Sequence, residues 1–222
     1  MGVRLRLGVL ASGQGTNLQA ILNAAGGEDF PAEVAVVLSN RPSAPALRRA
    51  RAAGVPAFAL PQQRFPSLLE RDLALVQRLR EHDVGLVVLA GYDRVLDPEF
   101  LVAFPERIVN IHPSLLPAFG GEHATAPRPQ QAALEYGCKL AGCTVQFVVD
   151  DGGIDTGPII AQSAVPIFDD DTLDTLVARL LHAEHRLLLA TIRAIAAGEV
   201  RLEGGRVRTG RLRPPDEPPI PA

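Results

Sequence analysis

The run Val84-Gly85-Leu86-Val87-Val88-Leu89-Ala90 decides the fold class of this 222-residue chain. It is uncharged, rich in valine and leucine, and too short to cross a membrane. A strand that is covered on both faces has this continuous apolar pattern, whereas a strand with one wet face alternates between apolar and polar residues. We therefore expect a strand at the centre of a parallel sheet.

Strand and helix patterns alternate on both sides of this run. Segments that favour strands lie at 3–11, 33–38, 57–60 and 107–112, and amphipathic segments that favour helices lie at 18–25, 44–53, 67–81 and 98–104. This alternation predicts an α/β fold with a doubly wound, mostly parallel twisted sheet flanked by helices. In such a sheet, ligands bind at the carboxyl ends of the strands.

The second half of the chain has a less regular pattern. We expect a loop over 118–129, a short helix at 130–136, strands at 143–149 and 158–165, a long helix from 171 or 172 to about 197, and a small hairpin of 200–203 and 206–209. Residues 1–210 are expected to form a single domain. Residues 211–222 are rich in proline, which predicts a disordered tail.

Composition limits the partners of the chain. Hydrophobic residues make up 47% of it, the formal net charge is −3 and the pI is near 6.0, so it lacks the broad basic surface that nucleic-acid binding needs. The apolar start is too short for a signal peptide, and no stretch has the roughly 18 apolar residues of a membrane span. We expect a cytoplasmic monomer or homodimer with a small-molecule partner, and no contact with nucleic acid or membrane.

A glycine loop, Ser12-Gly13-Gln14-Gly15-Thr16-Asn17, joins the first strand to the first helix. Backbone N–H groups at such a helix start, together with the helix dipole, favour a phosphate. The loop fails the dinucleotide fingerprint because Leu18 takes the place of the third glycine, and because Ser39-Asn40 supplies no acidic residue after the next strand. The pattern predicts a monophosphate site, or else a tight turn that needs glycine.

Asn110 and His112 lie at the end of the strand predicted at 107–112. Residues two apart in a strand point the same way, and Pro113 stops the strand, so both side chains should project from its carboxyl end. There they could form part of a catalytic site. The alternative is a capping asparagine beside a half-buried structural histidine.

Two features raise the question of a metal site. The loop from Asp150 to Gly157 is acidic and rich in glycine, but it lacks the alternating oxygen ligands and closing glutamate of a calcium-binding EF-hand. Cys138 and Cys143 lack partners for a zinc site and are too few for a disulfide framework, so both should be reduced and structural. We expect no metal.

Several motifs, taken in order, resemble the glycinamide ribonucleotide formyltransferase family of purine biosynthesis. The resemblance spans roughly residues 3–200 and rests on residues 12–21, Leu38-Ser39-Asn40, Leu89-Ala90-Gly91-Tyr92, Asn110-Ile111-His112-Pro113-Ser114-Leu115-Leu116-Pro117, Gly142-Cys143-Thr144-Val145, Ile154-Asp155-Thr156-Gly157-Pro158-Ile159-Ile160 and Ala183-Glu184-His185. It implies transfer of a formyl group from 10-formyltetrahydrofolate, a co-substrate, to the amine of glycinamide ribonucleotide.

The resemblance also implies residue roles. Asn110, His112 and Asp155 match the family's catalytic set: the first two would stabilise the oxyanion of a tetrahedral intermediate, and Asp155 would assist proton transfer. Glu184, which by itself would be assigned to the wet face of a helix, would bind the ribose. The phosphate would bind at Gly15, Thr16 and Asn17, and the folate pterin would lie against Tyr92, Asp93, Arg94, Val95 and Leu96.

The chain departs from the family's usual pattern at four places. Asp93 stands where an apolar residue is common, and Gln146 replaces a frequent histidine. The loop Asp150–Ile154 is longer than usual, and the segment Ala124–Pro129 holds an insertion near the expected cleft. These changes are expected to affect folate binding and loop closure, whereas the matched catalytic residues are intact.

Other functions remain open. Formyltetrahydrofolate deformylase and methionyl-tRNA formyltransferase share the chemistry, but the first normally carries an N-terminal regulatory domain and the second a C-terminal RNA-binding domain, for which we expect no room. A non-catalytic phosphoribosyl- or folate-binding module would not need Asn110, His112 and Asp155 together. A metal hydrolase that uses His112, His123 and Asp155 is the weakest alternative, because His123 lies in an irregular segment.

Overall fold

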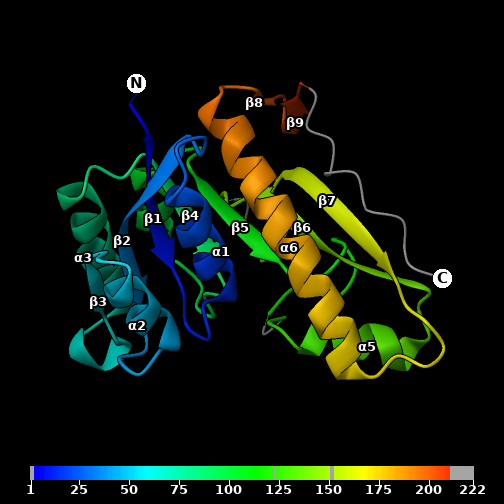
Figure 1. Ribbon diagram of the computed structural model, residues 1–222. Helices are drawn as coiled ribbons and strands as arrows, with labels where there is room; N and C mark the ends of the chain where they lie inside the picture. The colour runs from blue at the N-terminus through cyan, green and yellow to red at the C-terminus, as the bar shows by residue number, and fades with distance from the viewer. Residues whose placement is uncertain (1–2, 123, 151–152, 211–222) are drawn as a thin grey trace.

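The computed structural model describes residues 3–122, 124–150 and 153–210, and it has a seven-stranded sheet between layers of helices (Figure 1). The strands of this sheet are β1 (Leu5–Leu10), β2 (Ala32–Ser39), β3 (Ala57–Ala59), β4 (Leu86–Ala90), β5 (Ile108–His112), β6 (Leu140–Phe147) and β7 (Ile159–Pro166). The helices are α1 (Thr16–Ala25), α2 (Pro45–Ala52), α3 (Leu68–Glu81), α4 (Pro98–Ala103), α5 (Arg128–Tyr136) and α6 (Leu173–Ala196), with a short 3₁₀ turn, η1 (Gln62–Arg64).

The strand order is β3-β2-β1-β4-β5-β6-β7. The first five strands in this order pair in parallel, whereas β6 runs antiparallel to both β5 and β7. Residues 86–90 of the apolar run form β4, which is buried along its length between β1 and β5. The predicted doubly wound, mostly parallel sheet is confirmed. The direction of winding reverses between β1 and β4, the place where such sheets bind ligands.

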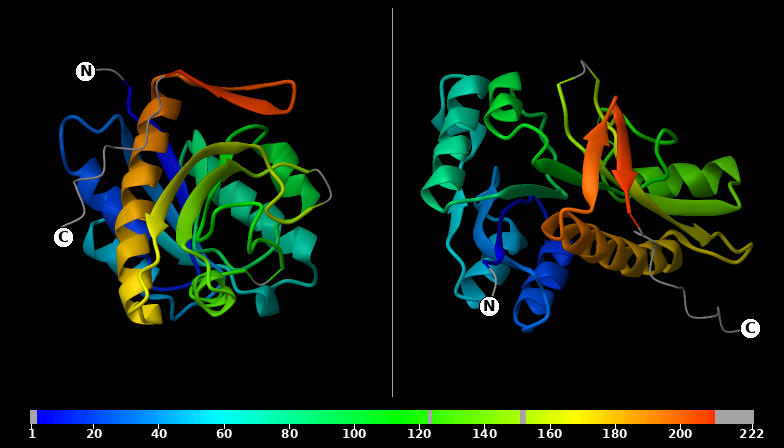
Figure 2. Two further views of the ribbon diagram at one scale, coloured as in Figure 1. Left: turned by 90° about the vertical axis from the view of Figure 1, so that its right-hand side faces the viewer. Right: turned by 90° about the horizontal axis from the view of Figure 1, so that it is seen from above.

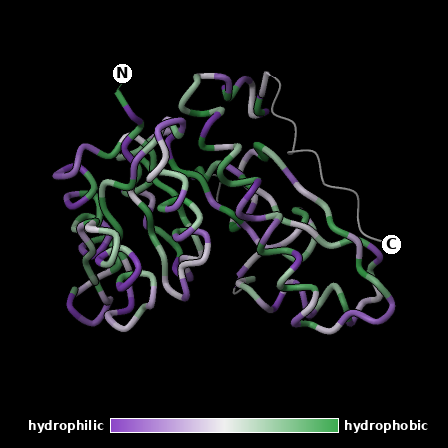
Figure 3. Tube along the Cα trace, in the orientation of Figure 1, coloured by the Kyte–Doolittle hydropathy of each residue, from purple (hydrophilic) through white to green (hydrophobic). Residues whose placement is uncertain are grey.

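Helices cover both faces of the sheet. One hydrophobic cluster joins α1, α2 and α6 to one set of strand side chains, and a second joins α3 and α4 to the opposite set. In β4, for example, Val88 belongs to the first cluster and Val87 to the second, as the alternation of a strand requires. Figure 2 shows the layers from two further sides, and in Figure 3 the strands at the centre of the molecule are mostly hydrophobic.

Several element boundaries differ by one to three residues from the sequence-based expectation, and two of them have a clear physical reason. α5 begins at Arg128 rather than at residue 130, because Pro129 suits the first turn of a helix, where its missing N–H is not needed. β6 begins at Leu140 rather than at residue 143, because its pairing with β7 extends to Leu140 and Pro166. The other predicted elements lie close to their expected positions, and η1 was not expected.

The C-terminal part of the described chain forms the expected hairpin of β8 (Val200–Glu203) and β9 (Arg206–Thr209). Gly204 and Gly205 both have positive φ, at 58° and 77°, as tight hairpin turns often require. The proline-rich segment 211–222, predicted to be a tail, lies outside the described residues. No helix of the described ranges combines the length and apolar character that a membrane span needs.

Candidate functional site

A cleft of about 980 Å³ lies at the carboxyl ends of the parallel strands. It is lined by the loops that follow β1, β4 and β5, by the loop before β7, and by part of α6. All residues for which the family resemblance implied a catalytic or binding role lie on this cleft: Gly15, Thr16, Asn17, Tyr92, Asp93, Arg94, Val95, Leu96, Asn110, His112, Asp155 and Glu184. The fold therefore brings these widely separated segments to one place.

Asn110 and His112 reach the cleft from the end of β5, and Asp155 faces them from the loop between β6 and β7. His112 is 3% exposed, and its Nδ1 lies 3.3 Å from Oδ2 of Asp155. The Asn110 amide donates to Oδ1 of Asp155 over 3.5 Å, which is the long limit of a hydrogen bond. The three side chains that were predicted to be catalytic are thus neighbours.

Two further groups hold the Asp155 carboxylate. The backbone N–H of Gly121 donates to Oδ2 over 3.0 Å, and the Gln146 amide donates to Oδ1 over 3.1 Å. Burial raises the pKa of Asp155, but the hydrogen bond and positive charge of His112, followed by these two donors, outweigh burial and hold the pKa below its ordinary value. Asp155 is therefore an anion at neutral pH. Sequence reasoning did not predict the contacts of Gly121 and Gln146.

The second ring nitrogen of His112 faces away from Asp155. Nε2 is buried and has no hydrogen-bond partner among the residues that the structure describes. Buried polar atoms normally have a partner, so an unpaired nitrogen on a cleft indicates a position where a substrate group binds. This geometry suits the donation of a hydrogen bond or a proton to a bound molecule.

The glycine loop ends at the N-terminus of α1. Gly15 has φ 71°, and a Cβ there would lie 2.9 Å from the Cα of Ala46, so the position requires glycine. Because this cap residue is glycine, no side chain covers the first N–H groups of the 10-residue helix, and its first turn carries no acidic residue. Gly15 and Thr16 line the cleft, so the positive end of the helix dipole lies there. No acidic side chain of the first turn neutralises it, which favours the binding of an anion.

Glu184 approaches this helix start from α6. It is 6% exposed and accepts a 2.8 Å hydrogen bond from the side chain of Asn17, so it is not part of the wet face of α6. Burial raises the pKa of Glu184, and the Asn17 bond and the charge of His112 only partly oppose this. Since the Asn17 amide faces Glu184, the group that Asn17 offers to an anion is its backbone N–H.

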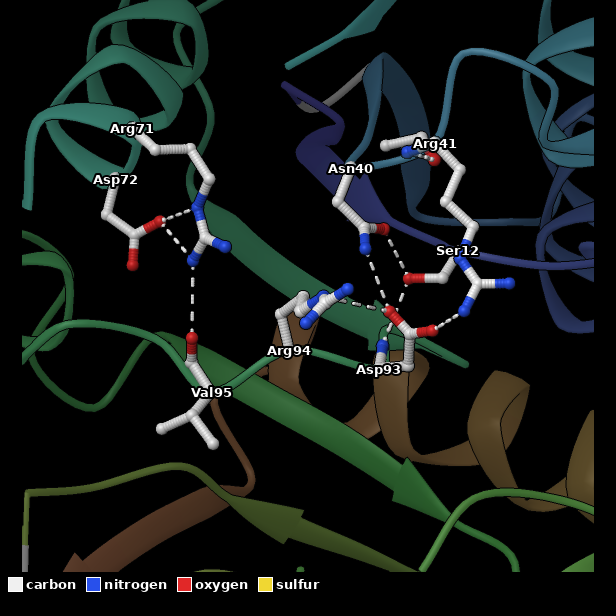
Figure 4. Close-up of polar contacts among 9 residues, drawn as sticks. Ser12, Asn40, Arg41, Arg71, Asp72, Asp93, Arg94 and Val95 are labelled. Atoms are coloured by element: carbon white, nitrogen blue, oxygen red, sulfur yellow. Dashed lines mark hydrogen bonds and ion pairs between the residues drawn. The ribbon is translucent and has the colours of Figure 1, made fainter. Parts of the chain in front are cut away.

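Figure 4 shows two polar clusters that hold residues 92–96, the segment after β4. In the first, the Asp93 carboxylate accepts a 2.8 Å bond from Asn40 and pairs with Arg41, and its backbone N–H donates to Ser12 Oγ over 3.0 Å. Burial raises the pKa of Asp93, but these partners outweigh burial and lower it. The unusual aspartate therefore ties the segment to the loops after β1 and β2.

The second cluster is a buried ion pair on α3. Arg71 and Asp72 are 1% and 0% exposed, and Nη2 of Arg71 lies 2.6 Å from Oδ1 of Asp72. Arg71 donates to the carbonyl oxygen of Val95 over 3.2 Å (Figure 4). The backbone N–H of Asp97 donates to Asp72 over 2.7 Å. Sequence reasoning missed this pair. The available signal was its position one turn before the buried Leu75, on the apolar face of α3, where charges need partners.

The described part of the chain contains no group of three His, Cys, Asp or Glu side chains that could hold a metal. His123 of the alternative metal site lies outside the described residues, so the absence of a metal stays a prediction. Cys138 and Cys143 are free thiols. Burial raises the pKa of Cys143 to about 12, which makes it an unreactive core residue.

Comparison with known proteins gives a consistent result. Residues 5–192 match the model of the formyl transferase family. A phosphoribosylglycinamide formyltransferase from Mycobacterium tuberculosis is 43% identical over 206 residues, which cover 93% of this chain and 92% of that protein. The crystal structure of glycinamide ribonucleotide transformylase 1 from Symbiobacterium toebii has 49% identity and a TM-score of 0.87, and the match covers 94% of this chain and 95% of that one.

Other relatives match less completely. The trifunctional purine biosynthetic protein adenosine-3 of Gallus gallus is 38% identical over 205 residues, but the chain spans only 20% of its length, and it spans 13% of the Drosophila melanogaster protein of the same name. A formyltetrahydrofolate deformylase from Pseudomonas syringae pv. tomato superimposes with a TM-score of 0.80 at 24% identity, and the match covers 66% of that chain. At that identity the likeness shows the fold alone.

Proposed function

The chain belongs to the formyl transferase family and is a formyltransferase, and we propose that it transfers the formyl group of 10-formyltetrahydrofolate to the amine of glycinamide ribonucleotide. The products are formylglycinamide ribonucleotide and tetrahydrofolate, in de novo purine biosynthesis. The observation that carries the proposal is the contact of Asn110, His112 and Asp155 in a cleft that also contains an open helix start at Thr16. Composition favours action in the cytoplasm, without nucleic acid or membrane as a partner.

The transfer is direct and forms no covalent bond to the enzyme. The amine nitrogen attacks the formyl carbon, a C–N bond forms, and the formyl oxygen becomes an oxyanion. The Asn110 amide and Nε2–H of a protonated His112 donate hydrogen bonds to this oxyanion, because charge develops there in the transition state. The intermediate collapses when the bond from the formyl carbon to N10 of the folate breaks, and the oxyanion becomes a carbonyl again.

A proton must leave the attacking nitrogen and reach N10. Asp155 is an anion beside His112, so it can accept that proton through a bound water, return it through the same water to N10, and support the positive charge of the imidazole. The Gly121 amide and Gln146 stabilise the same anion. No metal is needed in this scheme, because the hydrogen-bond donors stabilise the oxyanion.

The acceptor substrate is held at two points. Its phosphate binds the N–H groups at Gly15, Thr16 and Asn17, where the dipole of α1 favours an anion. Its ribose hydroxyls donate hydrogen bonds to the carboxylate of Glu184. This carboxylate is buried away from water, so hydrogen bonds in addition to the one from Asn17 stabilise it. Asn17 links the two points through its bond to Glu184.

The donor substrate lies along residues 92–96. The two clusters of Figure 4 fix this backbone, so its N–H and C=O groups are already oriented for the edge of a pterin ring. The inserted segment contributes Ala124, Thr125 and Ala126 to the same cleft and is therefore near enough to contact a substrate.

An absorbance assay tests the proposal by following the conversion of 10-formyltetrahydrofolate to tetrahydrofolate with and without glycinamide ribonucleotide. We expect turnover only when the ribonucleotide is present. Turnover without it would identify a deformylase. Tight ribonucleotide binding by calorimetry, with no turnover, would identify a non-catalytic binding module.

A further inference from the structure

Gln146 lies directly opposite Asn110 in the sheet, because β5 and β6 are antiparallel and pair these two residues. Residues paired in this way place their side chains on the same face. Gln146 is 2% exposed and lines the cleft. The pairing of β6 with β7 shifts register between Val145 and Gln146, and such bulges re-aim side chains beside active sites. The end of β6 therefore presents an amide to Asp155.

The hydrogen bonds of Asp155 divide between its two oxygens. Oδ2 faces His112 and the Gly121 N–H, whereas Oδ1 accepts from Gln146 over 3.1 Å and from Asn110 over 3.5 Å. Asn110 is also the proposed donor to the oxyanion, and its long bond to Asp155 is too weak to fix the carboxylate during the reaction. Gln146 has no part in the proposed contacts with the oxyanion, so its amide can hold Oδ1 throughout.

We propose that Gln146 is a positioning residue for formyl transfer, whose amide holds Oδ1 of Asp155 while Asn110 and His112 act on the substrate. This inference rests on the proposed function. Packing alone does not explain a glutamine here, because its Oε1 is buried without a partner in the described part of the chain, and an apolar side chain of similar length would avoid that cost. The group of Gln146 that serves the site is therefore its amide N–H, which donates to Asp155.

Gln146→Met tests the role, since methionine has a similar length and no donor. We expect kcat to fall about tenfold, with the KM of each substrate unchanged within about twofold, because the lost bond serves the chemical step. The acid limb of the kcat profile should move to higher pH, because the loss of a donated hydrogen bond raises the pKa of Asp155. The other titratable groups that act here are His112 on β5 and, through its interaction with His112, Glu184 on α6.

Two further variants serve as rescue and control. Gln146→His keeps an N–H donor and should recover kcat to within about threefold of wild type. Gln130→Met is the matched control, because Gln130 is also 2% exposed and its Oε1 also has no partner among the residues that the structure describes, but it lies on α5 away from the large cleft. It should change neither kcat nor the pH profile. If Gln146→Met does not fold, the isosteric Gln146→Glu replaces it, with the same expected loss of kcat and the same shift.

The pKa of the Asp155 carboxyl, measured by carbon NMR on the free protein, separates this inference from the proposed function. A higher Asp155 pKa in Gln146→Met than in wild type supports the contact even if wild type shows no formyl transfer, in which case only the proposed function fails. Formyl transfer by wild type together with an unchanged pKa and unchanged kcat in Gln146→Met would overturn the positioning role. A Gln146→His variant as slow as Gln146→Met would also overturn it.

Discussion

At the scale of single residues, the cleft separates groups for chemistry from groups for binding. His112 and Asp155 contact each other beside the end of β5, whereas Glu184 reaches the cleft from α6 and bonds to Asn17 at the start of α1. Because the two sets lie on different elements, a substitution in one set should leave the other in place.

We expect His112→Ala to lower kcat by about 10²–10⁴-fold, the usual contribution of a catalytic acid or base, while ribonucleotide binding changes little. Glu184→Ala should instead raise the KM for the ribonucleotide by about 10–100-fold, because hydrogen bonds to a charged group contribute about 1.5–3 kcal/mol each. Steady-state kinetics with both substrates varied will measure the two effects. Equal changes of kcat and KM in both variants would contradict the division of roles.

The sequence predicted which residues share a face but not which side chains meet. The period of a strand was enough to place Asn110 and His112 together. The contact of Gln146 with Asp155 depends on the antiparallel register of β5 and β6, and the bond of Asp93 to Asn40 depends on two loops that meet in space. Neither long-range relation leaves a periodic signal in the chain.

At the scale of elements, α3 does more than cover one face of the sheet. Its apolar residues pack in the core, but Arg71 and Asp72 interrupt this face and bond to the backbone at Val95 and Asp97. The helix therefore also positions the segment where the folate is proposed to bind.

Arg71→Met should destabilise the protein by about 3–5 kcal/mol, because it leaves the buried Asp72 without its charge partner. The double variant Arg71→Met/Asp72→Leu should recover most of that loss, since apolar residues often replace a buried ion pair without cost. Both variants should raise the KM for 10-formyltetrahydrofolate, because Val95 loses its Arg71 donor in both, and Asp97 also loses its Asp72 acceptor in the double variant. Urea unfolding and kinetics will measure both quantities, and a double variant with wild-type KM would show that the pair serves stability alone.

The ends of the helices lie within one residue of their expected positions, whereas α1 and α5 each start two residues earlier than expected. Ser67 and Asp97 cap α3 and α4 with side-chain oxygens, as expected for residues that favour N-caps. The start of α5 lies inside the segment 118–129, which was expected to be a loop. A proline in the first turn is compatible with the helix that follows.

At the scale of the whole molecule, several aspartates link stability to pH. The pKa of Asp171 is lowered chiefly by its hydrogen bond to Arg179, and the pKa values of Asp93 and Asp155 are also below the ordinary value. A carboxyl with a lower pKa in the folded state stabilises the fold above its unfolded pKa, about 3.9 for aspartate, and this contribution is lost as pH falls through the folded pKa.

We therefore expect the free energy of unfolding in urea to fall most steeply below about pH 4. Asp171→Asn tests whether the contribution of Asp171 to stability decreases toward low pH. Wild type should be more stable than Asp171→Asn at pH 6, and the difference should shrink as the pH falls below about 4, where Asp171 becomes protonated in the unfolded chain but is still ionised in the folded protein. A difference that grows toward low pH would contradict the assignment.

The α/β class of the whole molecule followed from the sequence, but its complete topology did not. Alternating strands and helices predicted the parallel part of the sheet around β4. The rule that ligands bind at the carboxyl ends of parallel strands predicted where the cleft lies. The antiparallel addition of β6 and β7 was not predicted, since the pairing direction of a strand is fixed by distant partners rather than by its own residues.

The central claim is that Asn110, His112 and Asp155 carry out formyl transfer to a ribonucleotide held in the same cleft. Single-turnover transfer from 10-formyltetrahydrofolate to glycinamide ribonucleotide, compared between wild type and Asp155→Asn, tests it most directly. We predict a rate at least about 100-fold lower in Asp155→Asn, with unchanged ribonucleotide affinity by calorimetry, because asparagine keeps the shape but not the charge. A wild-type rate in Asp155→Asn would contradict the account.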